Sequence, residues 1–350
     1  MTGGRGHDGA MEWRLGRRPG LDGLRGCAIL LVLACHLFGA ARGNDRYFTL
    51  GSTGVTLFFT LSGFLITSLL LEMELTWQGL RHFYVRRARR LLPALMSLVV
   101  VLGFLELALH QRFFAVVPTL FYFANWAQLS GWDQGLMRHG WSLAVEEQFY
   151  LVWPPLLLLS RRWVPGPLAL AVGGCILSMS LRFTLAGDGW RIYYGSDTQA
   201  ASLLVGAVLA VLAQRGLPQL RLPWWTPLTL AALALSHDMW VGWLLVPTIV
   251  PFAAAAMIWS ACADAGSLLG SSVLGYIGRR SYALYLWHYP ITLIIRQIVG
   301  PSLTWGLVSV GMSFVFAEVS WRMLESPLLR RGRTASSAST DRAADGVRAR

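Results

Sequence analysis

The chain has 350 residues, of which 55% are hydrophobic and 14% are charged, and its formal net charge is +12. Charged residues make up about a quarter of an ordinary soluble domain, so this composition indicates a protein of the lipid bilayer. The basic residues flank apolar segments and form no basic face interleaved with aromatic residues, which argues against nucleic acid and favours membrane lipids as partners. The four cysteines have no metal-ligand spacing and predict neither a disulfide framework nor a metal site.

The two ends of the chain differ from the apolar body. Residues 1–20 are polar and rich in Gly and Arg, without the apolar core of a signal peptide, and we expect a disordered cytoplasmic N-terminus. Residues 329–350 include a low-complexity stretch of Ser, Thr and Ala and predict a disordered cytoplasmic tail. The segment 21–328 predicts one transmembrane domain, because its loops are too short for a separate soluble domain.

Apolar segments recur along this body at close to bilayer length. Eleven are candidate spans: 24–41, 51–71, 91–109, 113–128, 143–160, 166–185, 199–214, 223–236, 241–260, 281–299 and 303–324. The segment 113–128 is short and contains Pro118 and Asn125, which is typical of a re-entrant or interfacial element.

The distribution of arginine decides the topology. If 113–128 does not cross, the arginine clusters at 81–90, 161–162 and 279–280 all lie on the cytoplasmic side, as the positive-inside rule requires. The sequence therefore predicts an all-α polytopic helical bundle in the cell (plasma or inner) membrane. We expect about ten transmembrane helices plus one re-entrant or interfacial segment, with both termini cytoplasmic.

The first span carries two ionisable residues. Arg25 and His36 are eleven positions apart, so on a helix they share nearly the same face at a separation of about 16 Å. Ionisable groups inside a bilayer usually face a protein interior and carry function. Imidazole relays protons near neutral pH, and guanidinium holds anions; the alternative is an Arg that reaches the headgroups and a His that serves packing.

Two adjacent carboxylates, Glu146 and Glu147, lie in the fifth span at about the depth of His36. Adjacent helical residues point about 100° apart, so at most one of them readily faces a given partner. A Glu–His pair would orient the imidazole as in general-base catalysis, and the alternative is a structural hydrogen bond between helices.

Further polar residues lie in the later spans. His288 is expected in the inner half of its span, where Pro290 frees the carbonyl of residue 286 and kinks the helix beside a cavity. Asp197 opens the seventh span on the outer side, where it is suited to cap that helix. A surface ion pair accounts for Glu325 at the cytoplasmic face.

The cytoplasmic loop before the third span contains four arginines in five residues: Arg86, Arg87, Arg89 and Arg90. Clustered guanidiniums at a membrane surface suit the phosphates of a ligand, and anionic lipid headgroups would satisfy the same cluster.

Five blocks of sequence resemble motifs of the acyltransferase-3 family of multi-span membrane acyltransferases, in the family's order: 21–26 with His36, 54–66, 83–94, 141–154 and 281–290. The resemblance runs from Leu21 to Pro327. One block departs, because Gln199 and Ala201 stand where family members commonly have a basic and an acidic residue.

The resemblance implies an O-acyltransferase that moves an acyl group, most often acetyl, from cytoplasmic acyl-CoA to a hydroxyl of a sugar-containing acceptor. Acyl-CoA would be a co-substrate, with no tightly bound cofactor and no metal. The acceptor would be an envelope glycan or glycolipid, or a glycosylated secondary metabolite such as a macrolide.

On this hypothesis His36 is the general base and Glu146 or Glu147 orients it. The arginines at 86, 87, 89 and 90, with Arg25, would hold the donor. The candidates for acceptor contacts or structural roles are Asp22, Asp197 and His288. Two alternatives stay open: a proton-coupled transporter that uses the same intramembrane charges, and a catalytically silent scaffold.

Overall fold

The computed structural model describes residues 14–16, 18–42, 47–74, 76–108, 115–162, 166–218, 225–263 and 268–327. Of the two termini expected to be disordered, residues 1–13, residue 17 and residues 329–350 lie outside these ranges. The ranges are helical and contain no strand, which confirms the predicted all-α class.

The principal helices follow one another along the chain as α1 (Pro19–Arg42), α2 (Phe48–Glu72), α3 (Trp77–Ala108), α4 (Val116–Leu120), α5 (Ala124–Leu129), α6 (Gly140–Ser160), α7 (Gly166–Thr184), α8 (Gly189–Tyr194), α9 (Ser196–Gln214), α10 (Trp225–Ala234), α11 (Val246–Ala263), α12 (Ser272–Arg279), α13 (Ser281–Val299) and α14 (Leu303–Ser320). Short non-α turns flank some of them, and the last, η5 (Trp321–Glu325), continues α14.

Seven segments of the described chain are long and apolar enough to cross a membrane: Pro19–Gly39, Phe48–Glu72, Trp77–Ala108, Gly166–Thr184, Ser196–Gln214, Val241–Ala263 and Leu303–Glu325. The protein is therefore a helical multi-span membrane protein, although the count of about ten spans is not confirmed.

The remaining predicted spans differ from these seven. The segments 143–160 and 281–299 form α6 and α13, of 21 and 19 residues, whose polar side chains lower their apolar character. The segment 223–236 contains α10, whose ten residues extend about 15 Å and are too few to cross. From residue 115 onward, the segment 113–128 forms the short helices α4 and α5, as expected for an element that does not cross.

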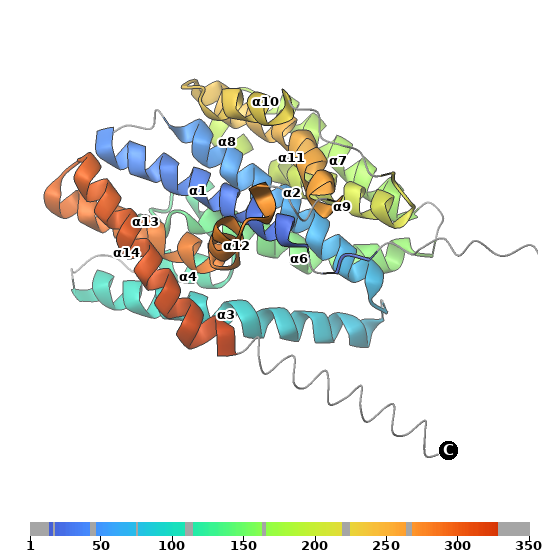
Figure 1. Cartoon of the computed structure of the whole chain (residues 1–350), viewed down its shortest axis with the longest axis horizontal. Helices are drawn as coiled ribbons and strands as arrows, with labels where there is room; N and C mark the ends of the chain where they lie inside the picture. The colour runs from blue at the N-terminus through green and yellow to red at the C-terminus, as the bar shows by residue number, and fades with distance from the viewer. Residues whose placement is uncertain are drawn as a thin grey trace, which may run out of the picture.

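Helices α2 and α9 pack together in the middle of the bundle, where α1, α7 and α11 also contact one or both of them (Figure 1). Their crossing is close because it places Gly63 and Gly206 at the contact. A Cβ at Gly63 would lie 1.8 Å from the Leu203 carbonyl oxygen, and one at Gly206 would lie 2.0 Å from that of Thr60. Small residues that let helix backbones approach are the usual means of packing inside a membrane.

Helix α3 extends along one side of the bundle, opposite α10 and α11 (Figure 1). It is continuous from Trp77 to Ala108 and includes Arg86 to Arg90. The expected cytoplasmic loop is therefore helical: residues 81–90 contain neither Gly nor Pro, and the helix continues through Pro93. Helical geometry, rather than a free loop, decides which way these arginines point.

Candidate active site

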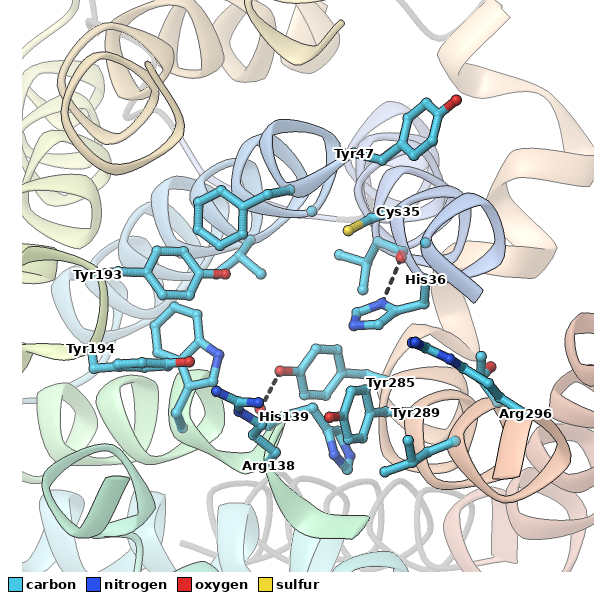
Figure 2. Close-up of a pocket in the computed structure, with 18 of the residues that line it drawn as sticks. Cys35, His36, Tyr47, Arg138, His139, Tyr193, Tyr194, Tyr285, Tyr289 and Arg296 are labelled. Atoms are coloured by element: carbon cyan, nitrogen blue, oxygen red, sulfur yellow. Dashed lines mark hydrogen bonds between the residues drawn. The ribbon is translucent and has the colours of Figure 1, made fainter. Parts of the chain in front are cut away.

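A cavity of about 320 Å³ opens beside the C-terminal half of α1, and we call it the outer cavity. Helices α1, α2, α8 and α13 and the start of α6 enclose it (Figure 2). Its chemically notable lining residues are His36, Tyr47, Arg138, His139, Trp141, Trp190, Tyr193, Tyr194, Tyr285, Tyr289 and Arg296. Its volume lies at the lower end of the range of about 300–1000 Å³ that is usual for small-molecule sites.

The His36 ring points into the outer cavity, as the sequence predicts (Figure 2). Its Nδ1 donates a hydrogen bond of 2.9 Å to the carbonyl of Val32, one helical turn earlier. A neutral imidazole whose Nδ1 carries the proton has its lone pair on Nε2. A backbone carbonyl thus sets the tautomer that general-base chemistry requires.

The predicted pairing of Glu146 or Glu147 with His36 is wrong, because both carboxylates have other partners. Glu146 accepts hydrogen bonds from Ser62 and Tyr150. Glu147 pairs with Arg87, at 2.5 and 3.2 Å. The expectation that two adjacent carboxylates face different partners holds, but neither partner is the imidazole.

Two further histidines pack around His36. The rings of His36 and His288 have centroids 4.9 Å apart, and His139 lies 5.7 Å from His288. His288 is therefore close to His36, and it lies in the first half of α13, the half expected on the inner side. Tyr289 contacts both His36, at 5.2 Å, and His139, at 5.1 Å.

His139 is a site residue that the sequence analysis did not identify. Its Nε2 donates a hydrogen bond of 3.1 Å to the Leu286 carbonyl. This is the carbonyl that Pro290 leaves without its helical N–H, so the carbonyl that the proline frees has a donor from another element. The available signal was the freed carbonyl itself, which needs a donor from another element.

Aromatic side chains form one wall of the outer cavity. Tyr193 packs against Trp141 with ring centroids 4.4 Å apart, and Trp190 stacks on Tyr194 at 5.6 Å. Behind the wall, Asn125 donates to the Tyr194 carbonyl at 3.0 Å. The wall is thus held by hydrogen bonds from α5 as well as by ring contacts.

The start of α9 holds the same wall from the other side. Asp197 lies in the first turn of α9 and not at the N-cap, which is Gly195, but its carboxylate accepts a hydrogen bond of 2.9 Å from the backbone N–H of Thr198. The same carboxylate forms a bidentate ion pair of 2.8 and 2.5 Å with Arg191 of α8. These hydrogen bonds raise the pKa of the Arg191 guanidinium above its ordinary value. Gln199, one of the two departures from the family pattern, donates to the carbonyls of Ile192 and Tyr193 at 3.2 and 3.0 Å.

The second departure, Ala201, is fully buried, and its backbone N–H donates a hydrogen bond of 2.9 Å to Ser178 Oγ. Close to this contact, the buried Arg182 of α7 donates to the carbonyls of Pro247 and Thr198. The guanidinium thereby ties α7 to α9 and α11. Arg182 is a structural cation that the sequence analysis did not single out.

A second, smaller cavity of about 50 Å³ lies towards the N-terminal half of α1, and we call it the inner cavity. Arg25, Glu146, Ser142, Tyr282 and Tyr285 are among the residues that line it. Arg25 and His36 thus each face a cavity from the same helix, as their spacing predicts. Val55 and Tyr285 line both cavities.

The four arginines of α3 do not act as one cluster. Arg87 is partly buried, bound to Glu147, and its guanidinium lies 3.5 Å from the centroid of the Tyr150 ring. Arg90, one turn later, is solvent-accessible and within electrostatic reach of Arg25. Arg86 and Arg89 are exposed as well. Arg86 shares a face with Arg90, one turn away, whereas Arg89 points about 100° away from Arg90.

The structure also gives the surroundings of two carboxylates that the sequence analysis named, Glu325 and Asp22. Glu325 is buried, at 2% exposure, and lies within electrostatic reach of Arg90 and Arg25, so the expected surface ion pair is wrong. Asp22 lies 3.8 Å from Arg279 of α12, a contact that supports a structural role for Asp22.

In the part of the chain that the structure describes, no three His, Cys, Asp or Glu side chains are grouped to hold a metal ion.

Comparison with known proteins gives the family context for this arrangement. The profile of the acyltransferase domain Acyl_transf_3 matches residues 18–321. The chain is 33% identical over 355 aligned residues to the peptidoglycan O-acetyltransferase OatA of Listeria monocytogenes, a match that covers 90% of this chain and 56% of the relative. It is 34% identical to YrhL of Bacillus subtilis, which is provisionally named a peptidoglycan O-acetyltransferase, over 90% of this chain and 55% of the relative.

A provisionally named O-acetyltransferase of Staphylococcus aureus (strain COL) is 31% identical over 90% of this chain and 58% of its own length. The chain therefore spans little more than half the length of these curated relatives. No solved structure matches the chain significantly. With a family profile that covers most of its residues and relatives above 30% identity across nine-tenths of it, the chain belongs to the acyltransferase-3 family.

Proposed function

We propose that this protein is a membrane O-acyltransferase that moves an acyl group, in the simplest case acetyl, from acyl-CoA to a hydroxyl of a glycan or glycoside. The observation that carries the proposal is the His36 ring, which faces the outer cavity while Arg25 of the same helix faces the inner cavity. One helix thereby connects a base to a cation about 16 Å away across the bundle. The names of the relatives support acetyl transfer to a glycan.

The donor would bind on the arginine side. Arg90 and Arg25 are the guanidiniums suited to the donor's phosphates, because Arg90 is solvent-accessible and Arg25 lines the inner cavity. Arg87 would have a structural role, because its ion pair with Glu147 joins α3 to α6. By the positive-inside rule this side would be cytoplasmic, in the cell membrane and with both termini on the same side.

The acceptor would occupy the outer cavity. Its aromatic wall offers apolar faces for a sugar ring, and Arg138 and Arg296 supply hydrogen-bond donors to the cavity. We infer that the acceptor belongs to the envelope glycans, with a glycosylated secondary metabolite as the second acceptor class.

The reaction follows from the tautomer of His36. Its Nε2 would take the proton of the acceptor hydroxyl as the oxygen bonds to the thioester carbonyl carbon. The carbon–sulfur bond then breaks with its electron pair on sulfur, and the imidazolium returns the proton to the thiolate. A positioned base of this kind contributes about a hundredfold to ten-thousandfold to the rate.

The test is thiol release from acetyl-CoA by the purified protein in nanodiscs, with glycan strands as acceptor and mass spectrometry of the O-acetyl product. His36→Ala should lower the transfer rate by about a hundredfold or more. His82→Ala, an exposed histidine on α3, is the matched control and should retain the rate. A folded His36→Ala protein with full transfer would overturn the scheme, and proton-coupled flux without thiol release would favour the transporter.

A further inference from the structure

Tyr285 lies at the boundary between the outer and inner cavities and lines both of them. Its hydroxyl donates a hydrogen bond of 2.6 Å to the His139 carbonyl, and the Ser142 hydroxyl lies 2.5 Å from it. A phenol has one proton, so Ser142 is the donor of the second bond. His139 lines the outer cavity and Ser142 the inner one, so the phenol is held from both sides.

The ring of Tyr285 is also fixed by its neighbours. Its centroid lies 5.4 Å from that of His139 and 5.5 Å from that of His288, two rings of the cluster around His36. Tyr285 therefore connects the partition between the cavities to the histidines of the site. Any displacement of the ring changes both its hydrogen bonds and these contacts.

The two cavities differ in size. A site for a small molecule usually has about 300–1000 Å³, whereas the inner cavity has about 50 Å³. A donor that enters from the Arg25 side needs more room than this cavity has, and the way to His36 leads past Tyr285 and Val55, which line both cavities. The ring lies between the inner cavity and the larger outer cavity, in which we place the acceptor.

We propose that Tyr285 is a gate between the donor side and the acceptor side, held closed by its hydrogen bonds to Ser142 and the His139 carbonyl. This inference rests on the proposed function for its purpose: the gate keeps water away from the thioester until the acyl group is delivered to His36. In the unwanted reaction, water adds to the thioester carbonyl carbon, the carbon–sulfur bond breaks, and the products are a carboxylic acid and the free thiol. A gate that is easier to open raises the rate of that reaction when no acceptor is present.

The first experiment measures thiol release from acetyl-CoA without acceptor. Tyr285→Phe removes both hydrogen bonds but keeps the ring, and should raise acceptor-independent hydrolysis by about tenfold, since each bond contributes a severalfold factor. Ser142→Ala removes one bond and should give a smaller rise. The double variant should equal Tyr285→Phe, because the Ser142 bond ends on the hydroxyl that is already absent.

Tyr84→Phe is the matched control, because Tyr84 donates a hydrogen bond of 3.0 Å to the Leu151 carbonyl away from both cavities. It should leave hydrolysis unchanged. If the wild type transfers acetyl groups and neither Tyr285→Phe nor Ser142→Ala changes hydrolysis, the gate is overturned while the proposed function stands.

The second experiment needs no catalysis. Cys35 lines the outer cavity, and serine at the other three cysteine positions leaves it as the one thiol of the chain. In sealed vesicles, a membrane-impermeant maleimide on the Arg25 side should label Cys35 slowly in this single-cysteine protein and severalfold faster when Tyr285→Ala is added to it. Equal labelling rates from that side would overturn the gate even if no acceptor or donor were active, which separates its failure from that of the proposed function.

Discussion

His139 Nε2 donates a hydrogen bond to the carbonyl of Leu286, at 3.1 Å, across the contact between the start of α6 and α13. The carbonyl is available because Pro290, four residues later, has no N–H to offer it. A helix defect that the sequence reveals is thus satisfied by a side chain from a segment about 150 residues away. The same hydrogen bond holds His139 beside His288 and Tyr289.

This relationship predicts a rescue of stability. His139→Ala should lower the free energy of unfolding by about 1–3 kcal/mol, because it leaves the buried Leu286 carbonyl without a donor. Adding Pro290→Ala supplies a backbone N–H to that carbonyl and should recover about 1 kcal/mol. Thermal unfolding in detergent measures both variants, and a double variant no more stable than His139→Ala would contradict the assignment.

The arginines of α3 predict unequal effects on donor binding. Arg90→Gln should raise the KM for acetyl-CoA by about tenfold or more, since a charged hydrogen bond contributes about 1.5–3 kcal/mol. Arg89→Gln is the matched control, an exposed arginine about 100° around the helix from Arg90, and should change the KM by less than about twofold. Initial rates over a range of donor concentrations give both values, and equal effects would show that the helix face does not decide donor binding.

Arg296 predicts a charge preference for the acceptor. It lines the outer cavity, so Arg296→Gln should raise the KM for an acceptor that carries a carboxylate or phosphate by about tenfold. Arg296→Lys should keep part of that affinity, because a single ammonium replaces a forked donor. The control is Arg322→Gln, which removes an exposed charge from η5. Comparison of a charged acceptor with its neutral analogue is the measurement, and an unchanged charge preference would contradict the prediction.

The crossing of α2 and α9 predicts a stability effect far from the cavities' polar chemistry. Gly206→Ala should destabilise the protein by about 1–3 kcal/mol, because the new Cβ would lie 2.0 Å from the Thr60 carbonyl oxygen, and backbone has to move. Gly311→Ala is the matched helical control, with no atom within 4 Å of its added Cβ, and should be neutral or stabilising by up to about 1 kcal/mol. Thermal unfolding measures the pair, and equal effects would contradict the close crossing.

The sequence alone determined the class of the fold and part of the site. Apolar segments of bilayer length identify membrane helices, because no other open structure satisfies its backbone hydrogen bonds in lipid. The spacing of Arg25 and His36 places both on one face of α1, since helical geometry relates residues that are close in sequence. The freed carbonyl of Leu286 follows from Pro290 for the same local reason.

Only the tertiary structure decided which residues meet across helices. It brought His139 and His288 to His36, paired Glu147 with Arg87 rather than with the imidazole, and buried Glu325 beside Arg90 and Arg25. A sequence periodicity gives the direction of a side chain around its own helix. The partner at the end of that direction depends on how neighbouring helices rotate and slide against each other, and close contacts such as Gly63 with Leu203 and Gly206 with Thr60 set that arrangement.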